Sequence, residues 1–107
     1  MAKKNIQDLK CGGKIMYSIL VYDIVMDERG KKILPKVFKT CKKYMIHIQN
    51  SVFEGELTEA KKLKLRAELN QIIRKNEDSV IIFTCRSQKW LEKEFWGKED
   101  DKMSNFL

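Results

Sequence analysis

One nearly uninterrupted apolar run, residues 15–24 (IMYSILVYDI), constrains the fold of this chain more than any other stretch. The run is rich in β-branched and aromatic side chains, which favour extended backbone. Its apolar residues occupy both alternating positions, and this pattern is typical of a strand buried on both faces. The sequence therefore predicts a central β-strand that later elements cover or flank.

Asp23 is the exception in this strand, because aspartate is a poor strand residue and is costly to bury without a partner. Two explanations are open. The carboxylate of Asp23 can accept hydrogen bonds from backbone amides of the following loop, a common use of aspartate at a turn. Alternatively, it can bind a metal ion or take part in phosphate chemistry.

The length of 107 residues predicts one domain with a modest core. A hydrophobic content of 43% with 35% charged residues indicates a folded chain with a well-solvated surface. No apolar run approaches the roughly 20 residues that span a bilayer. Residues 1–15 also lack the apolar core of a signal peptide or anchor, so we expect a cytoplasmic protein without membrane contact.

The three cysteines are odd in number and widely spaced, which disfavours a zinc motif or a disulfide framework. Cys41 and Cys85 fall within apolar patterns, and we expect both to be reduced core residues. Catalysis by a cysteine is disfavoured because His47 is the only histidine that could act as its base. His47 lies in strand-like sequence, where we expect it to face the surface.

Apolar residues recur at helical spacing after a charged loop, residues 25–32. Pro35 is tolerated in a first turn, so we expect this helix to begin within a few residues before it. The formal charge of +7 favours polyanionic partners. A lysine face on this helix is either simply solvated or a phosphate-contacting surface. Its members are Lys32, Lys36, Lys39 and Lys43, with Lys31 and Lys42 beside them.

The following elements complete a regular pattern. Residues 46–57 predict a tight hairpin around Asn50-Ser51. Thr58 is a predicted N-cap for a second helix, and residues 79–85 predict another strand. The apolar stripe of that second helix comprises Leu65, Leu69, Ile72 and Ile73.

The order strand, helix, hairpin, helix, strand predicts an α+β, ferredoxin-like βαββαβ sandwich, with two helices on one face of an antiparallel sheet. We expect the two most apolar strands, the first and the fourth, to lie at the sheet's centre. Residues 89–96 are interpreted as an additional C-terminal edge strand or a short helix. The predicted organisation is a flexible N-terminal extension (1–15), the domain (16–97) and a charged C-terminal tail (98–107).

Several segments together resemble one known family. They are Tyr22-Asp23-Ile24, the loop with Asp27 and Arg29, residues 48–57 (IQNSVFEGEL) and residues 78–83 (DSVIIF). Over residues 16–97 the chain resembles CRISPR-associated protein two, the smaller of the two CRISPR adaptation proteins.

The resemblance implies a cytoplasmic prokaryotic homodimer in which two sheets face each other and each terminal strand extends the partner's sheet. It also implies a partner, the adaptation integrase called CRISPR-associated protein one. Together they would hold duplex DNA for spacer acquisition at the repeat array.

The resemblance further implies a metal-dependent endonuclease acting on RNA or DNA. The residue matching Asp23 is the family's proposed magnesium ligand, and Tyr22 and Phe53 match positions grouped with it as catalytic. If Asp23 of each chain meets its mate across the dimer, two carboxylates share one Mg²⁺, a ligand number that suits this ion.

A non-catalytic adaptor is the alternative function. In this reading the exposed cations contact phosphates without reading bases. The predicted nucleic-acid-binding residues are Arg29, Lys31, Lys32, Lys36, Lys39 and Lys43. A generic ferredoxin-like regulatory domain is a third reading, disfavoured because no RNA-recognition aromatic strand and no glycine-rich phosphate loop are present in the sequence.

Overall fold

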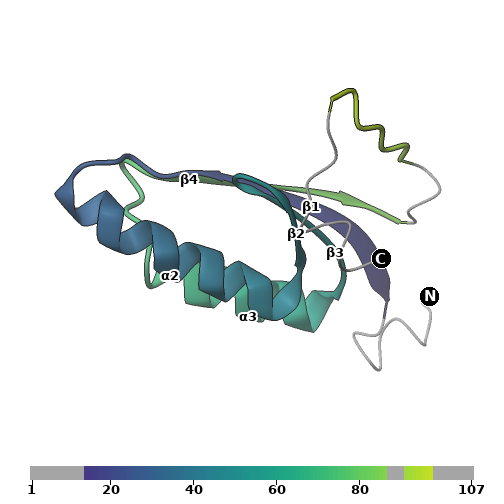
Figure 1. Cartoon of the computed structure of the whole chain (residues 1–107). Helices are drawn as coiled ribbons and strands as arrows, with labels where there is room; N and C mark the ends of the chain where they lie inside the picture. The colour runs from purple at the N-terminus through teal and green to yellow at the C-terminus, as the bar shows by residue number, and fades with distance from the viewer. Residues whose placement is uncertain (1–13, 87–90, 98–107) are drawn as a thin grey trace.

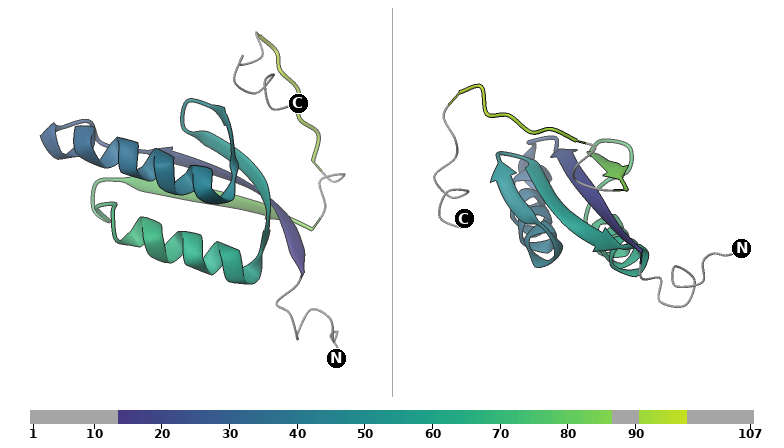
Figure 2. Two further views of the ribbon diagram at one scale, coloured as in Figure 1. Left: turned by 60° about the horizontal axis from the view of Figure 1, so that its bottom comes forward. Right: turned by 90° about the vertical axis from the view of Figure 1, so that its right-hand side faces the viewer.

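A computed structural model of the chain describes residues 14–86 and 91–97. Its elements are β1 (Ile15–Asp23), α2 (Glu28–Tyr44), β2 (Ile46–Gln49), β3 (Val52–Thr58), α3 (Glu59–Asn70) and β4 (Ser79–Cys85). The strands form one antiparallel sheet in the order β2-β3-β1-β4. Both helices pack on one face of this sheet, and residues 91–97 lie on the other side (Figure 1, Figure 2). The predicted α+β, ferredoxin-like fold is confirmed.

The hydrophobic core lies between the sheet and the two helices. Leu20 of β1 pairs in register with Phe53 of β3, and both side chains are almost completely buried. Val37 and Cys41 of α2 and Leu65 of α3 close over them. Burying a side chain of this size contributes about 1.5–3 kcal/mol, so this layer is the main source of stability. β1 occupies an interior position in the sheet, as its sequence predicts.

β4 lies at an edge of the sheet, so the prediction that it is central is wrong. Val80 and Ile82 of β4 pack toward the helix-covered core, but the alternate residues point the other way. Ile81 is 49% exposed and Phe83 is 59% exposed. Apolar residues at both alternating positions of β4 therefore mark a sheet face that the described residues leave partly uncovered, not a central strand.

α2 begins at Glu28, several residues earlier than the position of Pro35 predicts. The side chain of Asp27 caps the helix by accepting the Gly30 amide at 2.7 Å, and Glu28 adds an acidic first turn. Pro35 is consequently an interior residue, where its missing amide leaves the Lys31 carbonyl without a helical partner. The cap outweighs this loss and places Lys31 and Lys32 on the helix.

The hairpin and the second helix cap are confirmed. Asn50 adopts a left-handed backbone conformation (φ 38°) in the turn between β2 and β3. Thr58 Oγ1 accepts the Lys61 amide at 3.2 Å and caps α3. α3 ends at Asn70, so Ile72 and Ile73 of the predicted stripe lie in the following turn, still against the core.

Cys41 and Cys85 are free thiols. Cys41 is buried in the core as predicted, but the prediction of a core position is wrong for Cys85, which is half-buried and pairs in register with Tyr17 on the open face. The prediction for His47 is wrong, because its side chain is buried between Phe38 and Phe53, with ring centroids 4.9 and 5.0 Å away. Its Nε2 atom lies 2.9 Å from the Asn50 carbonyl oxygen. β2 is an edge strand, but α2 covers its inner face, and sequence periodicity over such a short strand does not reveal this.

Residues 91–97 are neither strand nor helix in the single chain, so the described part of the additional terminal strand is not formed. A strand needs a backbone partner, whereas this segment lies over the sheet face, where Lys93 Nζ contacts Glu54 Oε2 at 2.7 Å. The predicted N-terminal extension and the charged tail fall almost entirely outside the described residues. No helix within the described ranges is long and apolar enough to cross a membrane.

Candidate functional site

Asp23 is the last residue of β1 and pairs in register with Ser79 of β4. Leu20 and Tyr22 face the helices, so the alternation of a strand directs Asp23 toward the open face of the sheet. Its side chain is exposed and makes no hydrogen bond or ion pair within residues 14–86 and 91–97. The strand therefore delivers a carboxylate that other described groups do not occupy.

The loop-capping explanation of Asp23 is wrong, because two other aspartates perform that task. Asp78 Oδ1 accepts the Val25 amide at 3.0 Å, and Asp27 Oδ1 accepts the Gly30 amide. The Val25 and Gly30 amides are thus satisfied by Asp78 and Asp27, and the Asp23 carboxylate accepts no hydrogen bond from a described loop amide.

The chemistry of Asp23 fits a magnesium ion, and a second chain would bring the number of carboxylates to two. Mg²⁺ in proteins is held by one or two carboxylates and retains several waters. No group of three or more His, Cys, Asp or Glu side chains that could hold a metal occurs in the described part of the chain. The exposed Asp23 carboxylate would supply one ligand of such an ion, and Asp23 of a second copy would supply the other.

Tyr22 and Phe53 lie together, with ring centroids 6.1 Å apart, but on the helix-covered side of the sheet. Tyr22 is 4% exposed and Phe53 is fully buried. Burial raises the pKa of the Tyr22 hydroxyl to about 12, although a hydrogen bond with Ser51 opposes the shift. Both rings support the end of β1 from beneath, and their burial favours a role in shaping this strand over contact with a substrate.

A groove between α2 and the β2–β3 turn gathers several of the predicted cations. Its apolar wall is formed by Leu34, Pro35 and Phe38, and the turn residues Asn50 and Ser51 face them. The cations that line it are Lys36, Lys39 and Lys42. Arg29, Lys31 and Lys32 are exposed on the first turns of the same helix. This arrangement suits a polyanion lying along α2.

Lys43, also predicted to bind nucleic acid, does not line this groove. Its Nζ atom lies 2.5 Å from Glu68 Oε1, and the Tyr44 hydroxyl donates to Glu68 Oε2 at 2.5 Å. The hydrogen bond with Glu68 raises the pKa of Lys43. These contacts tie α2 to α3, so Lys43 is engaged within the chain while Lys42 takes its place beside the groove.

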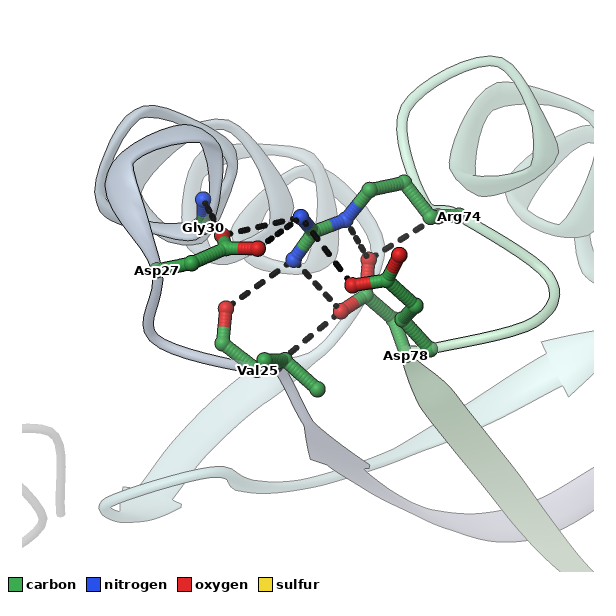
Figure 3. Close-up of polar contacts among 6 residues, drawn as sticks. Val25, Asp27, Gly30, Arg74 and Asp78 are labelled. Atoms are coloured by element: carbon green, nitrogen blue, oxygen red, sulfur yellow. Dashed lines mark hydrogen bonds and ion pairs between the residues drawn. The ribbon is translucent and has the colours of Figure 1, made fainter.

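Sequence reasoning missed a polar cluster just beyond Asp23 (Figure 3). Arg74, in the α3–β4 connection, donates from NH1 to Asp27 at 2.8 and 2.9 Å and from NH2 to the Val25 carbonyl at 2.9 Å. Its Nε and NH2 atoms also contact the two carboxylate oxygens of Asp78, each at 3.0 Å. We call Arg74, Asp78 and Asp27 the exit clamp, because they hold the chain where it leaves β1.

The exit clamp is strongly charged and mostly sheltered. The Asp78 side chain is fully buried and that of Arg74 is 12% exposed. The hydrogen bond from Arg74 lowers the pKa of Asp78 to about 2. The pKa of Asp27 is also lowered, mainly by the hydrogen bond from the Gly30 amide and then by that from Arg74. The sequence showed Arg74 only as one of many basic residues near α3, because its partners lie up to 49 positions away.

The model of the family described as CRISPR associated protein Cas2 matches residues 16–93. A CRISPR-associated endoribonuclease Cas2 from Fusobacterium nucleatum is 50% identical, with 98% of this chain and 99% of the relative aligned. A protein of the same name from Dictyoglomus turgidum is 42% identical, covering 86% of this chain and all of the relative.

Solved structures agree with this match. A structure described as Cas2 aligns with a TM-score of 0.69 and 33% identity, covering 79% of this chain and 90% of that one. Streptococcus pyogenes Cas2 aligns with a TM-score of 0.65 and 28% identity, covering 74% of this chain and 98% of that one. The fold, the sequence relatives and the family match agree, and the chain belongs to the Cas2 family of CRISPR-associated proteins.

Proposed function

We propose that this protein is a magnesium-dependent endonuclease that works as a homodimer with Asp23 of both chains in one site. The observation that carries the proposal is the exposed carboxylate of Asp23 at the open face of the sheet, which pairs with no other group in the described part of the chain. Relatives named endoribonucleases support a phosphodiesterase activity, with RNA as the first substrate to test.

The open face of the sheet supports the homodimer. Ile46, Ile81 and Phe83 are each close to half exposed or more, although they lie on a regular sheet surface. Exposed apolar surface of this kind marks an interaction site, and the sheet of a second copy presents the same surface. Facing sheets would cover these side chains and bring both Asp23 carboxylates to the same side of the interface.

Each residue then has a distinct role. The two Asp23 carboxylates would hold a magnesium ion, which would supply an activated water and neutralise charge on the scissile phosphate. The exposed cations of α2 bind the flanking phosphates and keep the nucleic acid in place, while Tyr22 and Phe53 keep the end of β1 rigid from within the core.

An Asp23→Asn substitution tests the catalytic proposal. Magnesium-dependent cleavage of RNA and of duplex DNA should fall at least about 100-fold, because the metal supplies several kcal/mol of transition-state stabilisation. Glu28→Gln is the matched control, since Glu28 is an exposed carboxylate near the same end of the sheet. Unchanged cleavage by Asp23→Asn in highly purified protein would contradict the proposal.

A non-catalytic adaptor is the second candidate function, favoured by the lysine-lined groove of α2. In this role the dimer binds duplex DNA and joins the adaptation integrase, CRISPR-associated protein one, for spacer acquisition in a prokaryotic cytoplasm. Changing Lys36, Lys39 and Lys42 to Gln should weaken duplex binding. The slope of log affinity against log salt concentration should become shallower by roughly 0.9 for each phosphate that is no longer neutralised.

The charge-matched control changes three exposed lysines around α3, namely Lys61, Lys64 and Lys75. Equal losses in the two triple variants would show that overall charge, not the groove, binds DNA. A side-by-side assay of integration and cleavage with Asp23→Asn separates the two functions, because integration that survives the loss of cleavage assigns the adaptor role independently of the nuclease.

A further inference from the structure

Asp23 lies between two points at which the backbone is held. On one side, the Tyr22 amide donates to the carbonyl of Ser51, in the turn before β3, at 3.1 Å. On the other side, both backbone groups of Val25 are bound by the exit clamp, its amide by Asp78 and its carbonyl by Arg74. The position of the Asp23 carboxylate therefore depends on the backbone contacts of Tyr22 before it and of Val25 after it.

Side-chain packing holds the exit loop only weakly. Ile24 is buried, but Val25 is 43% exposed and Met26 is 52% exposed. Two loop residues with exposed side chains would ordinarily be mobile, because few apolar contacts oppose their opening. The clamp replaces that packing with charge-assisted hydrogen bonds, which are about twice as strong as neutral ones.

The loop also lies directly against the first turn of α2. A Cβ atom added at Gly30 would lie 1.7 Å from the Val25 carbonyl oxygen, so only glycine permits this approach. Arg74 reaches the same carbonyl oxygen from the α3 side. The Val25 carbonyl is thus held between a helix turn and a guanidinium group, and this leaves little freedom two residues from Asp23.

One residue of the exit clamp lies next to the register partner of Asp23. Asp78 immediately precedes Ser79, the first residue of β4, and its carboxylate binds the chain that leaves β1. A functional group must be held within about 0.5 Å of its working position, usually by surrounding residues that do not contact the ligand. In a site shared by two chains, the Asp23 carboxylate of each chain must be positioned this closely.

We propose that Arg74 and Asp78 are positioning residues for Asp23, fixing the exit of β1 so that two Asp23 carboxylates can share one divalent cation. This inference rests on the proposed function. Supporting groups of this kind typically change metal affinity by roughly 10- to 100-fold when they are altered.

The test uses the full chain and Mn²⁺ as the probe ion, titrated well below the unfolding temperature. Arg74→Lys keeps the charge but loses the planar fork of donors, so Mn²⁺ affinity should fall by roughly 10- to 100-fold. Hydrogen exchange at the Val25 amide should become faster in the same variant. Arg66→Lys, an exposed arginine on α3, is the control and should change neither quantity.

A milder variant keeps the proposal testable if Arg74→Lys folds poorly. Asp27→Asn retains a good helix cap but weakens one arm of the clamp, and it should produce the same two changes at smaller size. A faster Val25 exchange with parent-like Mn²⁺ affinity would overturn the positioning role. Asp23→Asn separates the two proposals, because Mn²⁺ binding that survives it would overturn the shared metal site itself and the positioning role with it.

Discussion

The two faces of the sheet carry similar apolar side chains but differ in what covers them. On the helix side, Leu20, Phe53 and Leu57 are at most 2% exposed. On the open side, Ile81 and Phe83 are 49% and 59% exposed. Composition does not distinguish the faces, so the difference lies in what covers them: the helices of this chain cover one face, and in the proposed function a second copy covers the other. Asp23 lies on the second face.

The open face is not uniformly bare. Where residues 91–97 lie over it, Tyr17 donates a hydrogen bond to Glu54, and Lys93 pairs with the same carboxylate. Burial and the Glu54 hydrogen bond both raise the pKa of the Tyr17 hydroxyl. The polar groups buried here form hydrogen bonds with one another. The apolar side chains of β4, by contrast, are not covered by other described residues.

The largest expected contrast comes from one residue type on opposite faces. Phe53→Ala should lower the free energy of unfolding by about 3–5 kcal/mol, because it opens a cavity in the core. Phe83→Ala should change the unfolding free energy of the monomer by less than about 0.5 kcal/mol, since Phe83 is already exposed. Urea denaturation at dilutions that favour the monomer measures both, and equal losses would contradict the comparison.

The next effect concerns association. Phe83→Asp places a charge on the open face and should weaken self-association by about 2 kcal/mol, or roughly 30-fold, as expected for a central aromatic contact. Leu63→Asp is the matched control, because Leu63 is 55% exposed on the helix side. Sedimentation velocity measures the dissociation constants. Equal weakening by both changes would place the interface elsewhere.

A smaller expected effect is the pH dependence of stability that Asp78 of the exit clamp contributes. The pKa of Asp78 is about 2 in the folded chain and near its ordinary value when unfolded, so the ionised form stabilises the fold. This stabilisation is complete above about pH 4 and is lost as pH falls toward 2, on the order of 2 kcal/mol in all. Asp78→Asn should be less stable at neutral pH and should lose less on acidification, as followed by urea denaturation at several pH values. Parallel pH profiles for parent and variant would argue against the exit clamp.

Sequence reasoning succeeded where the signal was local. The Asn50-Ser51 turn and the Thr58 cap depend on neighbouring residues, and both are confirmed. The position of Pro35 predicts too late a start for α2, because the helix begins at the Asp27 cap and tolerates Pro35 in its interior. The succession of strands and helices is confirmed, but the composition of β4 did not indicate its edge position in the sheet.

The candidate site was only partly predictable. Asp23 is visible in the sequence because a charged residue ends an apolar strand, and the lysines of α2 are visible as a helical face. Lys43 was assigned to that face because its partner, Glu68, is 25 residues away. Arg74 was missed for the same reason, since its role exists only after the α3–β4 connection folds against the chain leaving β1.

The stoichiometry of Mn²⁺ binding to the purified protein is the most direct test of the central claim, because Mn²⁺ prefers the same oxygen ligands as Mg²⁺. A site shared through Asp23 predicts one tightly bound ion per two chains, lost in Asp23→Asn and in Phe83→Asp at concentrations where the latter is monomeric. One ion per chain, or binding that persists in both variants, would contradict a metal site shared across the open face.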